Sequence, residues 1–498
     1  MAGDPVLFSE VDSSPQGVIS APAMTRKKTL SDFSKEDLVH DLAYRLADEH
    51  FRRGMTMSEM ELCIDDAFRG ANALAALRVF LSRMPIEAST GKLCPKCGKR
   101  TPVKAKDRER TLRTLVGTVT LKRNYHYCDD CQLGWYPVDR ALELPEEGEL
   151  TAEMEKRALD FAINDVYGDC ADRWRLHYRA PLSETLFRNV VSRVGKQCES
   201  ADQHQLQAEL KPTPEKLAEV LVAEVDGSYL AIRGIEPWKE AKVGVIYRHD
   251  PVTKAPIPGT ARYVAVVNGL GEFAPVFEDA LKVERADEVY TVLWLGDGAI
   301  HNWRLAEQLL PNAIQILDWY HAVKHAVDCG KVLLGDESPL LPLWQQRAEA
   351  LLAAGEPAVL IAELMECVAL LPRRGRLECL TALDDLIRYY RTNAHRMRYA
   401  AFREAGWPIG SGAAESAHRH VLQIRMKRAG QRWAMPNARR MAGLRAAYRT
   451  AGPLDFYEAI RRARHRPRPA TPYWRRGHFR YAREGTRERE RCFKASSN

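Results

Sequence analysis

The sequence predicts an α/β core that is interrupted by a helical insertion and preceded by a zinc-binding region and a helical region. Between residues 220 and 322, the sequence predicts strands at 220–225, 242–247, 262–267, 289–295 and 313–317 and helices near 273–283 and 299–310, a mixture that is typical of α/β proteins. Two Cys-x-x-Cys pairs flank β-type runs at 91–140. Residues 331–405 are rich in Leu, Ala and Glu, a composition that predicts helices.

Length and composition limit the classes of protein that fit. The chain has 498 residues, 45% of them hydrophobic and 28% charged, as in soluble globular proteins of about three domains. It has no run of about 18 apolar residues, the length that a membrane-spanning helix needs, and its N-terminus lacks an apolar signal core. Eleven cysteines, an odd number, argue against a disulfide scaffold. We therefore expect a cytoplasmic protein with no membrane partner.

The expected segments follow one another without an internal repeat. Residues 1–30 are rich in Ser, Pro and Gly without a period, which predicts disorder. We expect helices at 31–90, a zinc ribbon at 91–145 and helices again at 146–212. The α/β core is expected at 213–330, and it resumes at 406–454 after the helical insertion at 331–405. Residues 455–498 form a basic tail.

The cysteine pairs predict a structural zinc ion. The four candidate ligands are Cys94, Cys97, Cys128 and Cys131. Zinc accepts four thiolates in a tetrahedron, and four cysteines leave no position for water. Apolar and polar residues alternate on both sides of Gly117, which predicts a hairpin between the two pairs. Four unrelated buried thiols are the alternative.

Three helical segments precede the core, at Glu153–Ile163, Cys170–His177 and Ser183–Lys196. One reading is a helix-turn-helix with the third segment as recognition helix. The polar side chains that would then reach DNA are Arg188, Asn189, Arg193 and Lys196, which suit a major groove. An ordinary three-helix packing unit explains the pattern equally well.

Three aspartates end predicted strands. Asp226 follows an apolar run at 220–225, Asp297 follows the strand at 289–295 between two glycines, and Asp318 ends the strand at 313–317. Ligands bind at strand ends in α/β sheets, and a buried carboxylate needs a partner or a metal. Each aspartate alone also fits a helix cap, but the three together favour a site for a hard cation.

Glu415 is a fourth candidate ligand, at the start of a helix after Gly410-Ser411-Gly412. The alternative is a helix-entry acid favoured by the helix dipole. Two Mg²⁺ or Mn²⁺ ions about 4 Å apart clamp the attacking and leaving oxygens of a phosphodiester. Asp226, Asp297 and Glu415 are the carboxylates expected to hold them.

Basic residues gather towards the C-terminus. Residues 416–454 contain nine Lys or Arg and no acid, and residues 461–491 contain twelve Arg against three Glu. This distribution indicates a polyanion partner, or a solvated tail for the last part. Next to Glu415, the residues expected to hold DNA phosphates are Arg425, Lys427, Arg428 and Arg432, three of which share a face at helical spacing.

These motifs together resemble bacterial insertion-sequence transposases of the DDE class, most closely the ISKra type. The motifs that carry the resemblance are Val225–Gly227, Gly296–Ala299, Ile316–Ala322, Gly410–Ser416 and Arg425–Trp433. The order matches, and a helical stretch separates the third motif from the glutamate. The resemblance covers most of residues 30–450.

The resemblance implies an RNase H-like core with Asp226, Asp297 and Glu415 as the metal-binding triad. It makes Asp318 and His321 an accessory pair, of which His321 either positions DNA or only fixes the strand-to-helix turn. It implies DNA strand cleavage by water, strand transfer by a 3′-hydroxyl, and a dimer or larger assembly on terminal inverted repeats and target DNA. In the cell it implies a nucleoid-associated bacterial protein.

Two other functions compete with this one. An RNase H-like nuclease or resolvase would cut DNA without strand transfer. A domesticated transposase would be a zinc-ribbon DNA-binding regulator without catalysis, which the intact set of carboxylates disfavours.

Overall fold

The computed structural model describes residues 92–178, 181–234, 237–370 and 377–465, together with helix α3 (Ala71–Arg83) and scattered positions between 41 and 67. The predicted disordered segment 1–30 lies outside the described residues, and the basic tail is described only as far as residue 465. The chain divides into two units, Met1–Leu112 with Val116–Ala141, and Arg113–Leu115 with Leu142–Asn498.

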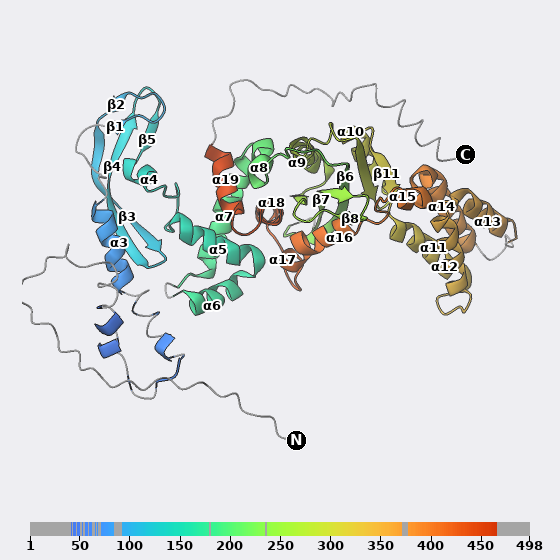
Figure 1. Cartoon of the computed structure of the whole chain (residues 1–498), viewed down its shortest axis with the longest axis horizontal. Coiled ribbons are helices and arrows are strands. Elements are labelled where there is room, and N and C mark those ends of the chain that lie inside the picture. Colours follow the sequence, from blue (N-terminus) through green and yellow to red (C-terminus); the bar gives the residue numbers. More distant parts are fainter. Residues whose placement is uncertain are drawn as a thin grey trace, which may run out of the picture. The chain divides into compact units, whose positions relative to one another are not determined.

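The first unit contains small antiparallel sheets (Figure 1). β1 (Lys92–Leu93) pairs with β2 (Arg100–Thr101), and β3 (Val103–Thr114), β4 (Gly117–Cys128) and β5 (Leu133–Trp135) form a three-stranded sheet. Gly117 opens β4 with a φ of 132°, a value that favours glycine. Val119, Leu121 and Arg123 are buried while the residues between them are exposed, so the predicted alternation is confirmed. α4 (Pro137–Ala141) packs on β4.

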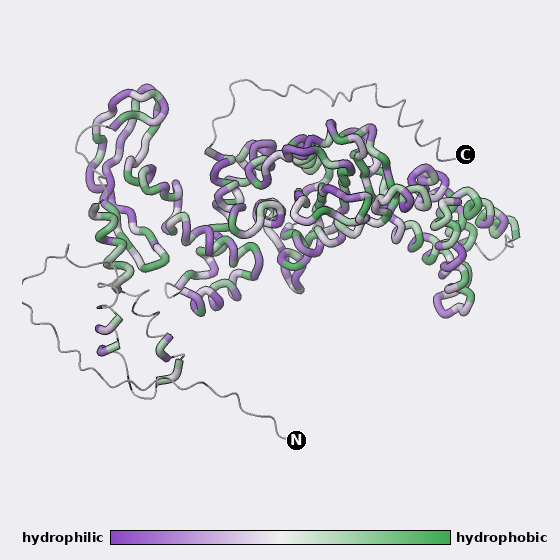
Figure 2. Tube along the Cα trace, viewed as in Figure 1, coloured by the Kyte–Doolittle hydropathy of each residue, from purple (hydrophilic) through white to green (hydrophobic). Residues whose placement is uncertain are grey.

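The second unit is built on a mixed sheet. β6 (Val220–Ala231), β7 (Trp238–Asp250) and β9 (Arg262–Val267) follow one another in antiparallel pairs. β10 (Thr291–Gly296) and β11 (Ile314–Leu317) are added in parallel on the other side of β6. The order across the sheet is β11-β10-β6-β7-β9, and the short β8 (Ala255–Pro256) pairs with the end of β7. Figure 2 shows hydrophobic residues along these strands.

All five predicted strands and both predicted helices of this region are present, with α9 (Leu270–Val283) before β10 and α10 (Ile300–Leu309) before β11. One difference matters for the site. β6 continues to Ala231 in register with β7, so Asp226 lies inside the strand and not at its end. The apolar run stops at Val225 because pairing with β10 stops at Glu224, and only β7 accompanies β6 beyond that point.

Helices surround the sheet. The predicted trio is observed as α5 (Ala152–Asn164), α6 (Tyr167–His177) and α7 (Glu184–Ser200), followed by α8 (Gln203–Leu210). Between β11 and the last segment lie α11 (Trp319–Leu334), α12 (Leu341–Ala353), α13 (Pro357–Leu370), α14 (Leu377–Asn393) and α15 (Tyr399–Glu404). The last segment comprises α16 (Gly412–Ala417), a π-helix at His418–Gln423, α17 (Ile424–Met426), α18 (Met435–Ala451) and α19 (Phe456–His465).

Candidate functional site

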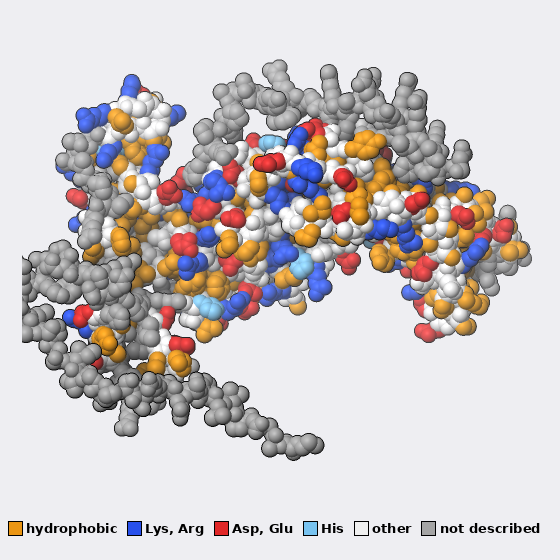
Figure 3. All heavy atoms as spheres, viewed as in Figure 1, with side chains coloured by type: hydrophobic (Ala, Val, Ile, Leu, Met, Phe, Trp, Pro, Cys, Tyr) orange, Lys and Arg blue, Asp and Glu red, His pale blue; other side chains and the backbone are white. Residues whose placement is uncertain are grey.

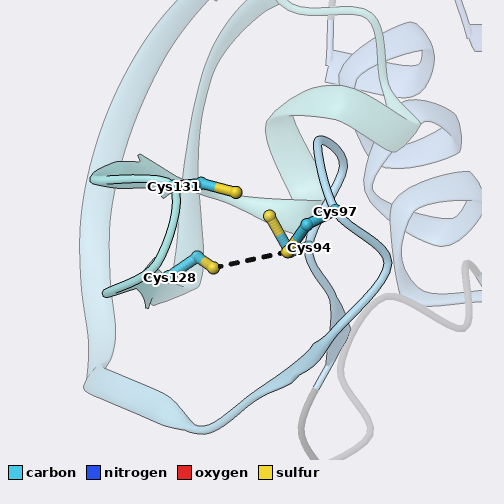
Figure 4. A group of neighbouring side chains, drawn as sticks. All are labelled: Cys94, Cys97, Cys128 and Cys131. Carbon is cyan, nitrogen blue, oxygen red and sulfur yellow. Dashed lines mark hydrogen bonds between the residues drawn. The ribbon is translucent and has the colours of Figure 1, made fainter.

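The four predicted zinc ligands lie together (Figure 4). All four sulfur atoms of Cys94, Cys97, Cys128 and Cys131 lie within 4.8 Å of one another, and the Sγ atoms of Cys97 and Cys128 are 3.7 Å apart. A tetrahedral zinc ion with Zn–S bonds of about 2.3 Å places its sulfurs about 3.8 Å apart. The spacing of the thiols therefore fits one zinc ion and is too long for a disulfide.

The pKa values of the thiols also indicate that a cation is needed here. Burial opposes ionisation of Cys94, but backbone N–H groups of Cys97 and Lys96 lower the pKa of its thiol to about 7. The Cys97 thiol and then burial raise the pKa of Cys131 to about 12. Four thiolates cannot gather here unless a positive ion neutralises them. Within the described part of the chain, no other three or more Cys, His, Asp or Glu side chains have ligand atoms that all lie within 4.8 Å of one another, so Asp226, Asp297 and Glu415 do not form such a group in this structure.

Asp226 lies inside β6, and Asp297 comes directly after the end of the neighbouring parallel strand β10. Each is two residues beyond the last pair between the two strands, which joins Glu224 to Leu295. The Asp226 side chain is 41% exposed, and its Oδ1 accepts the N–H of Gly227 at 2.6 Å. Oδ1 of Asp297 accepts the N–H of Ala299 at 3.0 Å. Both carboxylates are therefore held by main-chain N–H groups just beyond the paired part of β6 and β10.

Residues from two helices, α11 and α14, lie near these carboxylates. The pKa of His321 is raised, first by its bond to Asp318 and further by the charges of Asp297 and Asp226. From α14, the Tyr389 hydroxyl donates to the main-chain oxygen of Asp297 at 3.2 Å. The helical insertion therefore contacts the candidate site through Tyr389.

Glu415 lies on α16, which packs against β6 and β7. Its side chain is exposed. One turn later, Nε2 of the buried His418 lies 3.4 Å from Oδ2 of Asp226, and its Nδ1 lies 3.2 Å from Oγ of Ser228. The helix that carries Glu415 therefore contacts the strand that carries Asp226. Shared metal binding by Asp226, Asp297 and Glu415 stays a prediction.

Asp318 is buried, and both of its carboxylate oxygens accept hydrogen bonds. Its Oδ1 accepts the N–H of His321 at 2.7 Å and faces Nδ1 of the same ring at 3.0 Å. Its Oδ2 accepts both the N–H of Ser411 and the Ser411 hydroxyl, the latter at 2.7 Å. Burial opposes ionisation, but these bonds hold the pKa of Asp318 at about 2. The His–Asp pair thus fixes the strand-to-helix turn, while a DNA-positioning role for His321 stays a prediction.

Glu224 is a site residue that the sequence reasoning did not single out. It is completely buried two residues before Asp226, on the same face of β6. Its oxygens accept the Tyr247 hydroxyl and the N–H of Ala414, both at 2.7 Å. Burial raises its pKa to about 7. The signal in the sequence was an acid inside an otherwise apolar strand, which must find a partner.

Comparison with known proteins places the chain in a family. Residues 95–459 match an uncharacterised protein family, UPF0236. The chain belongs to the UPF0236 family. The span shared with UPF0236 starts inside the first cysteine pair and includes every carboxylate described above. No curated protein matches the chain.

Among solved structures, the chain is similar to the Drosophila P element transposase strand transfer complex. The TM-score is 0.23 at 11% sequence identity, over 61% of this chain and 80% of that chain. A likeness this low carries no argument about fold or activity. In the described part of this UPF0236 member, no helix is long and apolar enough to cross a membrane.

Arg425 corrects an expectation about DNA binding in this UPF0236 member. Only 1% of it is exposed. Its guanidinium lies over the rings of Tyr167 and Trp433, and Nε donates to the main-chain oxygen of Ala162 at 3.2 Å. The expected basic face with Arg428 and Arg432 does not form, because the helix ends at Met426. Arg425 is therefore a core residue.

The other basic residues of this segment differ in exposure. Arg428 lies 3.6 Å from Asp165 and 3.8 Å from Asp169, so acids from elsewhere in the chain balance part of the charge. Lys427 and Arg432 are exposed. Burial lowers the pKa of Lys427 while the charge of Asp226 opposes this, so Lys427 lies near the carboxylates. On the face in Figure 3, basic side chains lie among acidic ones.

Helix α7 matches the predicted third helix, with its N-cap Ser183 accepting the N–H of Leu186. Arg188, Asn189 and Lys196 are exposed on it, and their contact with DNA stays a prediction. Arg193 is different, because it forms an ion pair with the buried Glu155. The charge of Arg193 is therefore neutralised within the helical core. The prediction that Arg193 binds DNA is corrected accordingly.

Proposed function

We propose that this chain is a metal-dependent DNA transposase of the DDE class, of the ISKra type, with an RNase H-like core. One observation carries the proposal: Asp226 in β6 and Asp297 directly after β10 lie equally far beyond the last pair of these parallel strands, and the helix with Glu415 packs on the strand of Asp226. Along the chain, three antiparallel strands are followed by a helix, a strand, a helix and a strand. This order agrees with the core expected from the sequence.

The residues suit a hard divalent cation, because Mg²⁺ and Mn²⁺ prefer carboxylate oxygens. Asp226 is partly exposed, and Asp297 is followed by Gly298, whose φ of 95° favours glycine in the turn that carries this carboxylate. Two such ions, held by Asp226, Asp297 and Glu415, would stabilise charge on the attacking and leaving oxygens of a phosphodiester.

Other residues act directly on DNA in this proposal. Lys427 lies near Asp226 and offers positive charge to the phosphate backbone beside the carboxylates. The His321 side chain is 47% exposed, and the charges of Asp297 and Asp226 act on it. In this proposal, His321 holds a DNA strand in place. Further from the site, Arg432 and the exposed residues of α7 bind the duplex, and the zinc ion stabilises the first unit.

The proposed reaction is hydrolysis of DNA strands at the ends of an insertion sequence, followed by joining of the 3′-hydroxyl ends to target DNA. The partners are the terminal inverted repeats, the target DNA and at least one further copy of the chain.

The test is cleavage and joining of an oligonucleotide that carries the terminal repeat flanking the gene, with Mg²⁺ or Mn²⁺. Asp226→Ala, Asp297→Ala and Glu415→Ala should each abolish both activities and leave DNA binding intact, because each removes a metal ligand. Asp384→Ala, on an exposed position of α14, is the matched control. If one of the three variants cleaves at the wild-type rate, that residue is not an essential ligand.

Two outcomes would redirect the proposal. Cleavage without joining would indicate a nuclease or resolvase. Specific DNA binding without cleavage in either metal would indicate a regulator.

A further inference from the structure

The helix that carries Glu415 begins beside the sheet and continues through the π-helix and α17 to Met426. α16 spans six residues, Gly412–Ala417, and follows Gly410-Ser411. The first N–H groups of a helix have no partner within the helix, and an N-cap side chain normally accepts one of them. Ser411 occupies the N-cap position, yet its side chain makes no capping bond. The partners of these donors must come from elsewhere.

Glu224 supplies one of them from the middle of the sheet. Its Oε2 accepts the N–H of Ala414 at 2.7 Å, and its Oε1 accepts the hydroxyl of Tyr247 on the neighbouring strand at 2.7 Å. Because Tyr247 holds one oxygen, the other is aimed at α16. Glu224 is completely buried, so it contacts neither solvent nor DNA.

Asp318 supplies a second attachment from the end of β11. Its Oδ2 accepts both the N–H and the hydroxyl of Ser411, which is why the Ser411 side chain is not available as a cap. The adjacent main chain is tied as well, since the N–H of Trp319 donates to the oxygen of Ile409 at 2.8 Å. The loop before α16 is therefore joined to the turn after β11.

We propose that Glu224 and Asp318 are positioning residues that hold the segment 411–414 against the sheet and so set the place of Glu415 relative to Asp226 and Asp297. The inference rests on the proposed function, because it concerns the alignment of that triad. It assigns to two further acids a task that is distinct from metal binding. One turn after Glu415, His418 contacts Ser228 of β6, which is a further contact between this helical segment and the sheet.

The attachment of α16 needs an acceptor at Glu224. Each of the two acids receives donors on both of its oxygens. Glu224→Gln would keep the attachment, because its amide oxygen can accept the Ala414 N–H while its NH₂ group donates to the Tyr247 hydroxyl, which both donates and accepts. Glu224→Met has a similar side-chain volume and no such acceptor, so it removes the attachment of α16.

The experiment uses the full chain with three substitutions. Glu224→Met removes the first attachment, and Ser411→Ala removes the hydroxyl contact with Asp318 while leaving the bonds of Asp318 to His321. Glu219→Gln is the matched control, because Glu219 is exposed directly before β6. Two quantities are measured: hydrogen exchange of peptides that cover 411–417, and DNA cleavage at saturating DNA together with DNA affinity.

We expect exchange in 411–417 to become at least tenfold faster in Glu224→Met, and faster to a smaller degree in Ser411→Ala. Cleavage at saturating DNA should fall at least tenfold in Glu224→Met, while DNA affinity stays within twofold of the wild type. A merely structural role would lower cleavage and affinity together. Glu219→Gln should change neither quantity.

Unchanged exchange in both variants would overturn the inference, and so would faster exchange with full cleavage by Glu224→Met. If the wild type does not cleave DNA, the proposed function fails, and hydrogen exchange alone decides whether the two acids hold α16. If Glu224→Met does not fold, Tyr247→Phe replaces it, because it removes only the hydroxyl that orients Glu224. Exchange in 411–417 must then rise in Tyr247→Phe for the inference to stand.

Discussion

Asp318→Asn tests how much the buried acid at the start of α11 stabilises the second unit. The carboxylate has a pKa of about 2 in the folded chain, against 3.8 for an ordinary aspartate. One pKa unit corresponds to about 1.4 kcal/mol, so the shift corresponds to about 2 kcal/mol of the free energy of unfolding at neutral pH. The side chain is 3% exposed, so solvent screening does not reduce this value.

The sign of the pH dependence follows from the lowered pKa. A carboxyl group that is more acidic when folded stabilises the fold above its unfolded pKa, and this contribution is lost as the pH falls towards the folded value. The difference between wild type and Asp318→Asn should therefore be constant between pH 5 and 7. It should shrink to roughly half at pH 3, midway through this window.

The measurement is denaturant unfolding at several pH values, followed by a signal from the second unit. Asp384→Asn, at an exposed position, is the control and should unfold like the wild type at every pH. A loss below about 0.5 kcal/mol at pH 7, or a difference that grows towards pH 3, would refute the assignment of Asp318 as a charged acceptor of these hydrogen bonds.

Three further predictions concern zinc, DNA and the Asp297 turn. Cys97→Ser should lose the one bound zinc ion in elemental analysis and unfold the first unit, because structural zinc supplies folding energy; a variant that keeps zinc would contradict this. Lys427→Ala with Arg432→Ala should weaken binding of all DNA sequences and lower the salt slope by roughly one unit per lost phosphate contact. Arg425→Ala, a core change, should lower the unfolding midpoint instead and leave the salt slope unchanged. Gly298→Ala should abolish cleavage at unchanged DNA affinity, since alanine is strained at a φ of 95°.

The sequence predicted the strands of the second unit well, because alternating and apolar runs are local signals. β9 was predicted at its observed bounds, Arg262–Val267. The zinc ligands could be predicted equally well, because the spacing of the cysteines alone brings them together in two turns. Both signals lie within a few residues of the chain.

The errors came from contacts between distant segments. Glu224 contacts Ala414 across 190 residues, so nothing near Glu224 in the sequence reveals its partner. Arg193 and Arg425 were assigned to DNA from charge and helical spacing, but Glu155 neutralises the first, and Tyr167 and Trp433 enclose the second. A basic side chain can serve the core as well as a phosphate, and only the packing distinguishes the two.

The two aspartates of the candidate site differ in how firmly the backbone holds them. Asp226 is part of a continuous strand, in register with β7 on both sides of it, whereas Asp297 lies in a turn between glycines that is hydrogen-bonded to α10 and Tyr389. In the proposed reaction, metal ions would stabilise charge on both the attacking and the leaving oxygen. The strand would then hold one ligand in a fixed place, and any adjustment would fall to the turn, which is held by Ala299, by Asn302 and by Tyr389 of the helical insertion.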